Sequence, residues 1–138
     1  MVEQNKLTCS FAFNQITQEN SALRVNSEAA SIGFIYRHIG ETMLMFGHFF
    51  GLPVTTPNTT MGQVDDGRLF DLKESQILVQ KGYAMMKELA KTIPETDWSQ
   101  VIETPFFGTS SKIKMFSHIL FHTAHHAGQI SLTLSRGK

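Results

Sequence analysis

The chain has 138 residues and a mass of 15.5 kDa, so we expect residues 1–138 to form a single domain. Twelve Lys and Arg residues balance twelve Asp and Glu residues, which leaves no surplus of positive charge for a nucleic-acid partner. The single cysteine excludes an internal disulfide and a thiolate-rich metal cluster. The sequence has neither a membrane-span pattern nor a signal-peptide pattern, so we expect a cytoplasmic protein with no membrane partner.

Hydrophobic periodicity predicts four helices and no strand. The first helix spans about residues 2–18, and the second spans about residues 28–50 with Asn26 or Ser27 as its N-cap. Apolar residues recur along the second helix at three- and four-residue steps: Ile32, Ile35, Ile39, Met43, Phe46 and Phe50. A second apolar row lies beside this stripe, so we expect the helix to be buried on more than one side, as in a bundle.

A connection rich in Thr, Gly, Pro, Asn and Asp follows at residues 51–70. About twenty residues is long for a connection in a compact domain, and such loops often form lids or binding loops. Asp71 and Glu74 then match a capping box at the start of a third helix, residues 72–92. The fourth helix starts near Thr109 or Ser110 and runs to about residue 135. The sequence therefore predicts an all-α fold, a four-helix bundle with a long connection between helices 2 and 3.

Histidines concentrate on the predicted fourth helix, at His118, His122, His125 and His126. Residues four apart lie on the same face of a helix and can hold one metal ion between them. At about 100° per residue, His122 and His126 lie nearer the apolar side, whereas His118 and His125 lie almost opposite it. A buried site would therefore use His122 and His126, and the other two histidines would lie nearer solvent or a subunit contact.

A third ligand should come from another helix, and the candidates are His38 and His48 on the predicted second helix. We favour His38 because it adjoins the apolar stripe, whereas His48 lies on a more exposed flank near the helix end. Three neutral imidazoles leave at least one open metal position, at which a water or a thiol can be activated. Glu41, one turn after His38, either assists such a site or forms a salt bridge elsewhere.

Other candidate sites have simpler interpretations. We expect Cys9 to be a structural thiol and Asp65-Asp66-Gly67 to form a turn, because the alternating oxygen ligands of a calcium loop are missing. A di-iron carboxylate site is excluded because the histidine-rich helix has no Glu. The alternative to an enzyme is a non-catalytic helical bundle that binds a small ligand or a partner, with the metal absent or structural.

Two segments resemble a known family: Ser-Ile-Gly-Phe-Ile-Tyr-Arg-His-Ile-Gly-Glu at residues 31–41, and His-Ile-Leu-Phe-His-Thr-Ala-His-His-Ala-Gly-Gln-Ile at residues 118–130. Together with the long connection and the Pro-Phe-Phe-Gly segment before the last helix, they resemble the DinB/YfiT-like family over essentially the whole chain. One departure is Ala127, where the family often has an Arg that could contact an anion or a thiol cofactor.

The resemblance implies an up-down-down-up four-helix bundle, often a homodimer. It places one divalent metal ion, such as nickel, zinc or iron, on His38, His122 and His126. It also implies a metal-dependent transferase or hydrolase acting on a small-molecule substrate, which for some relatives is a low-molecular-weight thiol.

Overall fold

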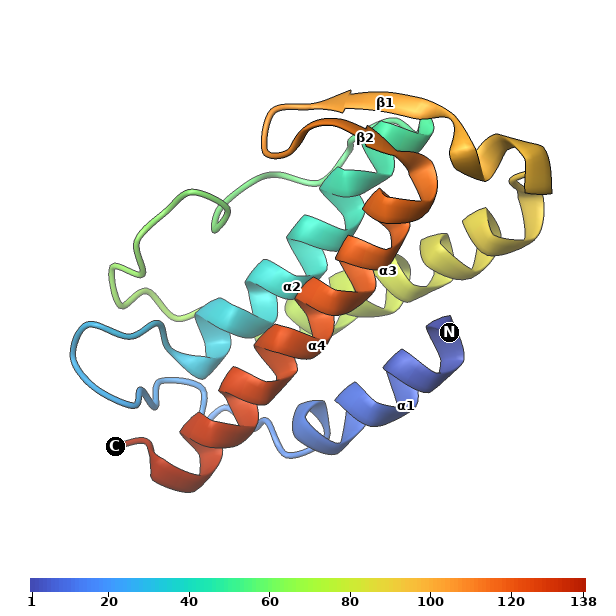
Figure 1. Ribbon diagram of the computed structural model, residues 1–138. Helices are drawn as coiled ribbons and strands as arrows, with labels where there is room; N and C mark the ends of the chain where they lie inside the picture. Colours follow the sequence, from blue (N-terminus) through green and yellow to red (C-terminus); the bar gives the residue numbers. More distant parts are fainter.

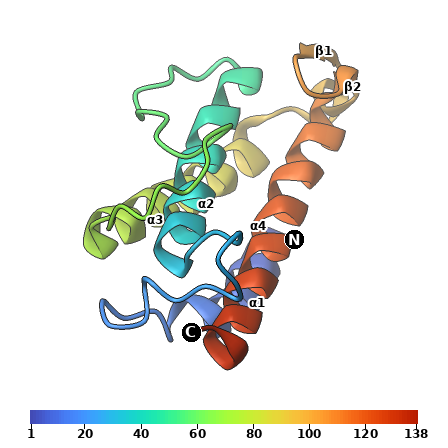
Figure 2. The same cartoon turned by 90° about the vertical axis from the view of Figure 1, so that its left-hand side faces the viewer.

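The structure is a computed structural model that describes residues 1–138, and it consists mainly of four helices (Figures 1 and 2). The helices and strands, in chain order, are α1 (Val2–Phe13), α2 (Ile32–Phe46), η1 (Gly47–Phe50), α3 (Leu72–Thr92), η2 (Glu95–Ser99), β1 (Val101–Thr104), β2 (Gly108–Ser111) and α4 (Lys112–Arg136). None of these helices combines the length and hydrophobicity that a membrane crossing requires. The predicted all-α four-helix bundle is confirmed.

The long connection, residues 51–71, is a crossover. Figure 1 shows that it returns along the bundle, so that α2 and α3 run in the same direction while α1 and α4 run in the opposite one. This is the up-down-down-up order. At the far end of α4, the backbone of Lys138 donates to and accepts from the backbone of Arg24, with N···O distances of 2.9 and 3.3 Å. These two bonds join the end of the chain to the connection between α1 and α2.

Helix α2 is the centre of the bundle, and twelve of its fifteen residues are buried. It packs between α3 and α4, as the continuous apolar pattern predicts. Two glycines let α2 and α3 approach closely: a Cβ on Gly40 would lie 2.7 Å from Cβ of Leu78, and a Cβ on Gly82 would lie 2.8 Å from Cβ of Met43. The position of α2 between two helices determines which of its side chains can face α4.

The predicted ends of the first two helices are wrong by several residues. Helix α1 ends at Phe13 because the side chain of Asn20 bonds to the carbonyl of Gln15 and the amide of Thr17, which competes with helical pairing. Helix α2 starts at Ile32, with Ser31 as its N-cap. Asn26, a predicted cap, instead stabilises an isolated turn by accepting from two following amides.

The prediction of no strand is also wrong. Residues 101–104 and 108–111 form an antiparallel hairpin, in which Val101 pairs with Ser111. The tight connection is stabilised by Thr104, whose hydroxyl donates to the carbonyl of Gly108. Gly108 has a φ of 61°, a conformation that favours glycine. Because the hairpin extends to Ser111, α4 begins at Lys112, slightly later than predicted.

The predicted capping box forms only in part. Asp71 accepts a hydrogen bond of 2.9 Å from the amide of Glu74, as expected of an N-cap. The reciprocal bond from Glu74 is absent, because its carboxylate pairs instead with Arg37 of α2 at 3.3 Å. The start of α3 is therefore linked to α2 by an ion pair.

Candidate metal centre

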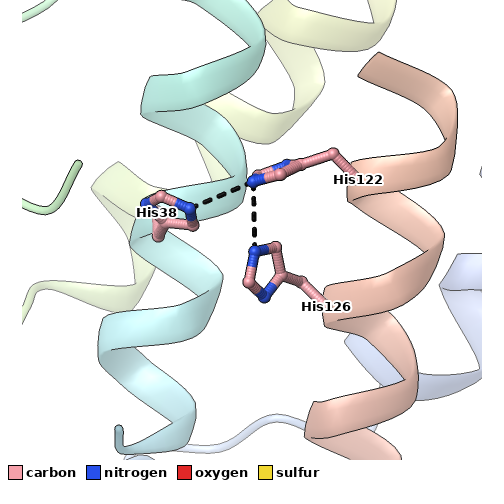
Figure 3. Close-up of side chains that lie close together, drawn as sticks. All are labelled: His38, His122 and His126. Atoms are coloured by element: carbon pink, nitrogen blue, oxygen red, sulfur yellow. Dashed lines mark hydrogen bonds between the residues drawn. The ribbon is translucent and has the colours of Figure 1, made fainter. Parts of the chain in front are cut away.

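Three imidazoles from two helices converge at one point inside the bundle (Figure 3). His122 and His126 lie one turn apart on α4, and His38 faces them from α2. The Nε2 atom of His122 lies 3.1 Å from Nε2 of His38 and 3.1 Å from Nε2 of His126. One nitrogen from each ring belongs to a set in which all members lie within 4.8 Å of one another. His48 takes no part in this cluster.

The spacing and chemistry of these nitrogens fit a divalent first-row ion. Two nitrogens bound to one ion at about 2.0–2.1 Å, with an angle between square and tetrahedral, lie about 2.9–3.4 Å apart. Both Nε2···Nε2 distances from His122 fall in this range, and the nitrogens of the third pair, His38 and His126, lie within 4.8 Å of each other. No carboxylate or thiolate belongs to the cluster, and an all-imidazole donor set suits zinc, iron, nickel or copper rather than calcium or magnesium.

The surroundings keep these three imidazoles neutral, as ligation requires. Burial lowers the pKa of His38 to about 4 and that of His122 to about 3, and the neighbouring imidazoles add to both effects. Burial also lowers the pKa of His126, although Gln129 opposes this. Their nitrogen lone pairs are therefore free to bind a metal near neutral pH.

Gln129 fixes the orientation of His126. Its side-chain oxygen lies 2.6 Å from Nδ1 of His126, one turn away on α4. An amide oxygen only accepts, so Nδ1 carries the proton and the lone pair of Nε2 faces the cluster. On the other helix, the hydroxyl of Thr42 lies 3.4 Å from Nδ1 of His38. Nδ1 of His122 is buried and has no hydrogen-bond partner.

The remaining histidines lie outside the cluster. His125 is exposed and stacks on Phe121, as the helical periodicity predicts. His118 is half-buried against Phe107 of the hairpin, with ring centroids 4.5 Å apart, so it is less exposed than expected. His48 is exposed in η1. Helical periodicity thus separated the inward pair from its neighbours on α4 correctly.

Glu41 is fully buried, but its carboxylate is directed to groups other than the histidines. It accepts from Arg37 at 2.7 Å, from the amide and hydroxyl of Thr59 at 2.8 and 2.7 Å, and from the hydroxyl of Thr60 at 2.8 Å. Burial alone would raise its pKa, but these hydrogen bonds outweigh burial and the pKa lies below its usual value. Of the roles considered for Glu41, the structure shows the salt bridge.

A cavity of about 450 Å³ lies beside the three histidines, and His38 and His126 form part of its wall. Its buried lining residues are Phe34, Ile35, Thr60 and Thr133. Its exposed lining residues are Val25, Gly62, Gln63, Gln129 and Leu132. The cavity is therefore open to solvent on one side and reaches the imidazoles on the other.

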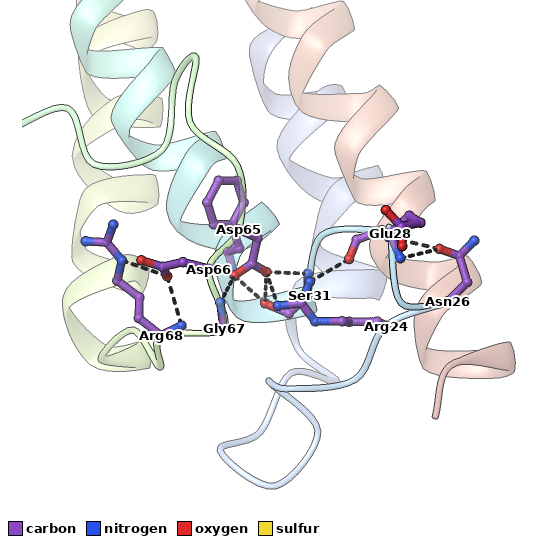
Figure 4. A network of polar contacts seen from close by, with 10 residues as sticks. Arg24, Asn26, Glu28, Ser31, Asp65, Asp66, Gly67 and Arg68 are labelled. Atoms are coloured by element: carbon purple, nitrogen blue, oxygen red, sulfur yellow. Dashed lines mark hydrogen bonds and ion pairs between the residues drawn. The ribbon is translucent and has the colours of Figure 1, made fainter.

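The 51–71 connection supplies part of this wall and is fastened at two places. Glu41 holds Thr59 and Thr60, as described above. Asp65 accepts from the amide and hydroxyl of Ser31 at 2.8 and 2.7 Å and pairs with Arg24 at 2.9 Å (Figure 4). The amide of Gly67 bonds back to Asp65, which gives the predicted turn. The connection is thus a fixed wall of the cavity.

Several residues of this site were not identified from the sequence. Gln129 follows His126 at a one-turn spacing, which could have marked it as a partner of the imidazole. Thr60 and Gln63 come from an irregular connection, and Ala29 and Ala30 come from another. No periodic pattern places such residues, so the sequence carried no signal for the cavity.

Three solved structures share this fold. YfiT from Bacillus subtilis, described as a probable metal-dependent hydrolase with an unusual four-helix bundle topology, matches with a TM-score of 0.73 at 12% identity, over 98% of this chain and 82% of the other. A protein from Enterococcus faecalis matches with a TM-score of 0.70 at 13% identity, over 96% of this chain and 89% of the other. A DinB-like protein from Bacillus cereus matches with a TM-score of 0.67 at 15% identity, over 95% of this chain and 84% of the other. At these identities, the likeness establishes the fold alone.

The sequence comparison identifies the family. No curated protein matches the chain. The profile of the DinB superfamily matches residues 11–130, which include all three clustered histidines and all of α2 and α3. The resemblance of segments 31–41 and 118–130 to this family is confirmed by that match. The chain belongs to the DinB superfamily.

Proposed function

We propose that this protein is a metal-dependent enzyme in which His38, His122 and His126 hold one divalent metal ion. Its substrate is a small molecule, and its reaction is a hydrolysis or the transfer of a thiol to an electrophile. The observation that carries the proposal is the convergence of three neutral Nε2 atoms beside a solvent-accessible cavity. The description of the similar YfiT as a probable metal-dependent hydrolase supports the reaction class.

The arrangement favours a catalytic ion over a structural one. Structural zinc sites are closed by four protein ligands, whereas catalytic sites have three and an open position. Only three ligand side chains meet here, and two of them line the cavity. When bound, a divalent ion would polarise a substrate oxygen or lower the pKa of a water or thiol.

The protein's own contribution is to position the three imidazoles and to shield them from water. Gln129 holds the proton of His126 on Nδ1, and the buried floor of Phe34 and Ile35 excludes water from one side of the imidazoles. No carboxylate lines the cavity, and that of Glu41 is fully engaged with Arg37 and the long connection. The chain therefore offers no carboxylate general base next to the three histidines.

The test is elemental analysis of protein purified without an affinity tag, beside a variant that lacks the central imidazole. Wild-type protein should contain about one divalent metal ion per chain. His122→Ala should contain almost none, because His122 contacts both other rings. Circular dichroism should show that the variant keeps its helices.

His125→Ala is the matched control, since it removes an exposed imidazole from the same helix. It should keep the full metal content. Stoichiometric metal in His122→Ala, or a wild-type protein that binds no divalent first-row ion, would contradict the proposal. A bound ion that exchanges no water ligand would indicate a structural role in a non-catalytic bundle.

A further inference from the structure

The cavity beside the histidines has no charged side chain in its wall. Its thirteen lining residues include no Asp, Glu, Lys or Arg, and the only titratable ones are the clustered His38 and His126. The others are apolar residues, glycine, threonines and glutamines. A carboxylate or phosphate group placed against this wall, away from the three histidines, would lose its hydration and gain no cation in return.

The guanidinium of Arg24, which precedes the lining residue Val25, does not supply this missing cation. Arg24 lies behind the wall, where Nη2 forms an ion pair of 2.9 Å with Asp65 and Nη1 donates to the carbonyl of Ala29 at 2.7 Å. Figure 4 shows Arg24 and Asp65 directed at each other. The charge of Arg24 is thus balanced by a carboxylate that is itself largely buried, and it is unavailable to a ligand.

Few polar groups remain for a ligand to contact. The hydroxyl of Thr60 donates to Glu41, and that of Thr133 donates to the carbonyl of Gln129. The side-chain amide of Gln63 forms no hydrogen bond within the chain, and neither does the side-chain nitrogen of Gln129. Both glutamines lie at the exposed rim, where they can bind one or two uncharged polar groups.

We propose that this cavity selects small molecules that are uncharged on the part lying beyond the three histidines, with an apolar body over Phe34, Ile35 and Leu132 and an amide-like polar group at Gln63 or Gln129. This proposal rests on the proposed function only because both concern the same site. It narrows the substrate class to compounds that are uncharged on that part, and it excludes thiols or esters that carry a carboxylate or phosphate there. A volume of about 450 Å³ accommodates a molecule of this kind.

The test compares two probes of nearly equal shape, phenylacetamide and phenylacetate, by calorimetric titration of the metal-free full chain at pH 7.5. Metal-free protein is used because a carboxylate could bind a metal directly. We expect phenylacetamide to bind at least tenfold more tightly than phenylacetate. Ala30→Trp, which fills the cavity from its wall, should abolish binding of the amide.

A charge placed in the wall should change the preference. Leu132→Lys introduces an ammonium at an exposed lining position, where folding should tolerate it, and should strengthen phenylacetate binding at least fivefold. Ser131→Lys is the matched control, because it adds the same charge at an exposed neighbouring position outside the cavity wall. It should leave the binding of both probes unchanged.

The proposal is overturned if wild-type protein binds phenylacetate as tightly as the amide, if neither probe binds, or if Ala30→Trp folds and still binds the amide. These outcomes are independent of metal content. A protein in which elemental analysis finds no metal can still bind the amide more tightly than the carboxylate. A protein that holds one metal ion can bind the two probes equally.

Discussion

The carboxylate of Glu41 lies one turn beyond His38 on α2, yet it accepts a hydrogen bond of 2.8 Å from the hydroxyl of Thr60 in the long connection. It therefore holds the cavity wall against the helix that carries His38. The bonds from Arg37 and Thr59 complete the set, so every oxygen of this buried carboxylate is occupied. Glu41 is a positioning residue for the cavity.

Glu41→Ala should destabilise the bundle by about 3 kcal/mol, because it leaves the buried guanidinium of Arg37 with only the exposed Glu74. Urea denaturation of the metal-free protein measures this loss. Metal content should stay at the wild-type value in the folded protein, since Glu41 contacts none of the clustered imidazoles. A folded Glu41→Ala protein that has lost its metal would assign Glu41 a role at the metal itself.

Gln129→Leu should weaken metal affinity about 10- to 100-fold, because the proton on Nδ1 of His126 loses its acceptor and the ring is no longer oriented. Competition with a chromophoric chelator measures the affinity. Gln80→Leu, an exposed glutamine on α3, is the control and should bind metal normally. Equal affinity in both variants would show that the 2.6 Å contact does not support the site.

Gly40→Ala should destabilise the protein by about 1–3 kcal/mol, because the new Cβ would lie 2.7 Å from Cβ of Leu78 and 3.0 Å from the backbone nitrogen of Val79. Gly128→Ala, in the middle of α4 with no atom near the new Cβ, should instead stabilise the protein by about 0.5–1 kcal/mol. Thermal denaturation of both variants measures the two changes in stability, which should have opposite signs. A stable Gly40→Ala protein would mean that α2 and α3 can separate without cost.

The metal-free protein should lose stability as the pH falls below about 6.5. The pKa of His38 is lowered to about 4 and that of His122 to about 3, so between pH 6.5 and these values the unfolded chain binds protons that the native state does not. Each histidine should reduce the free energy of unfolding by about 2 kcal/mol between pH 7 and pH 5.

Urea denaturation at the two pH values tests this dependence. His122→Ala should show a smaller loss of stability than wild-type protein, since one depressed pKa is removed. His125→Ala, which removes an exposed histidine, should keep the wild-type dependence. A stability that is the same at pH 5 and pH 7 in metal-free protein would show that the imidazoles are solvated rather than buried.

Long periodic segments were predictable from the sequence, and short irregular ones were not. Helix α3 ends at Thr92 as predicted, because Pro94 disfavours continuation and the apolar period is regular. The hairpin was missed because each strand has four residues, and its stabilising contacts involve Thr104 and the backbone of Gly108. The start of α2 was misplaced because Asn26 and Ser31 both resemble N-caps, and only tertiary packing selects one.

The same distinction applies to the site. The angular positions of residues around the helix were enough to distinguish His122 and His126 from His125. The apolar row beside His38 was enough to predict that His38 faces the interior of the bundle. The orientation of Glu41 was not predictable, because its partners Thr59 and Thr60 come from a connection whose path depends on packing. That the three histidines bind a metal stays a prediction until it is measured.

The paired backbones of Arg24 and Lys138 connect the segment after α4 to the wall of the cavity, because Val25 follows Arg24. A bulky label on the side chain of Lys138 would lie next to the segment that supplies Val25, Ala29 and Ala30 to the cavity. Such a label would strain the backbone hydrogen bonds between Arg24 and Lys138 and displace the lining residues that follow Arg24. A label on the exposed side chain of Met1, the N-cap of α1, avoids this segment.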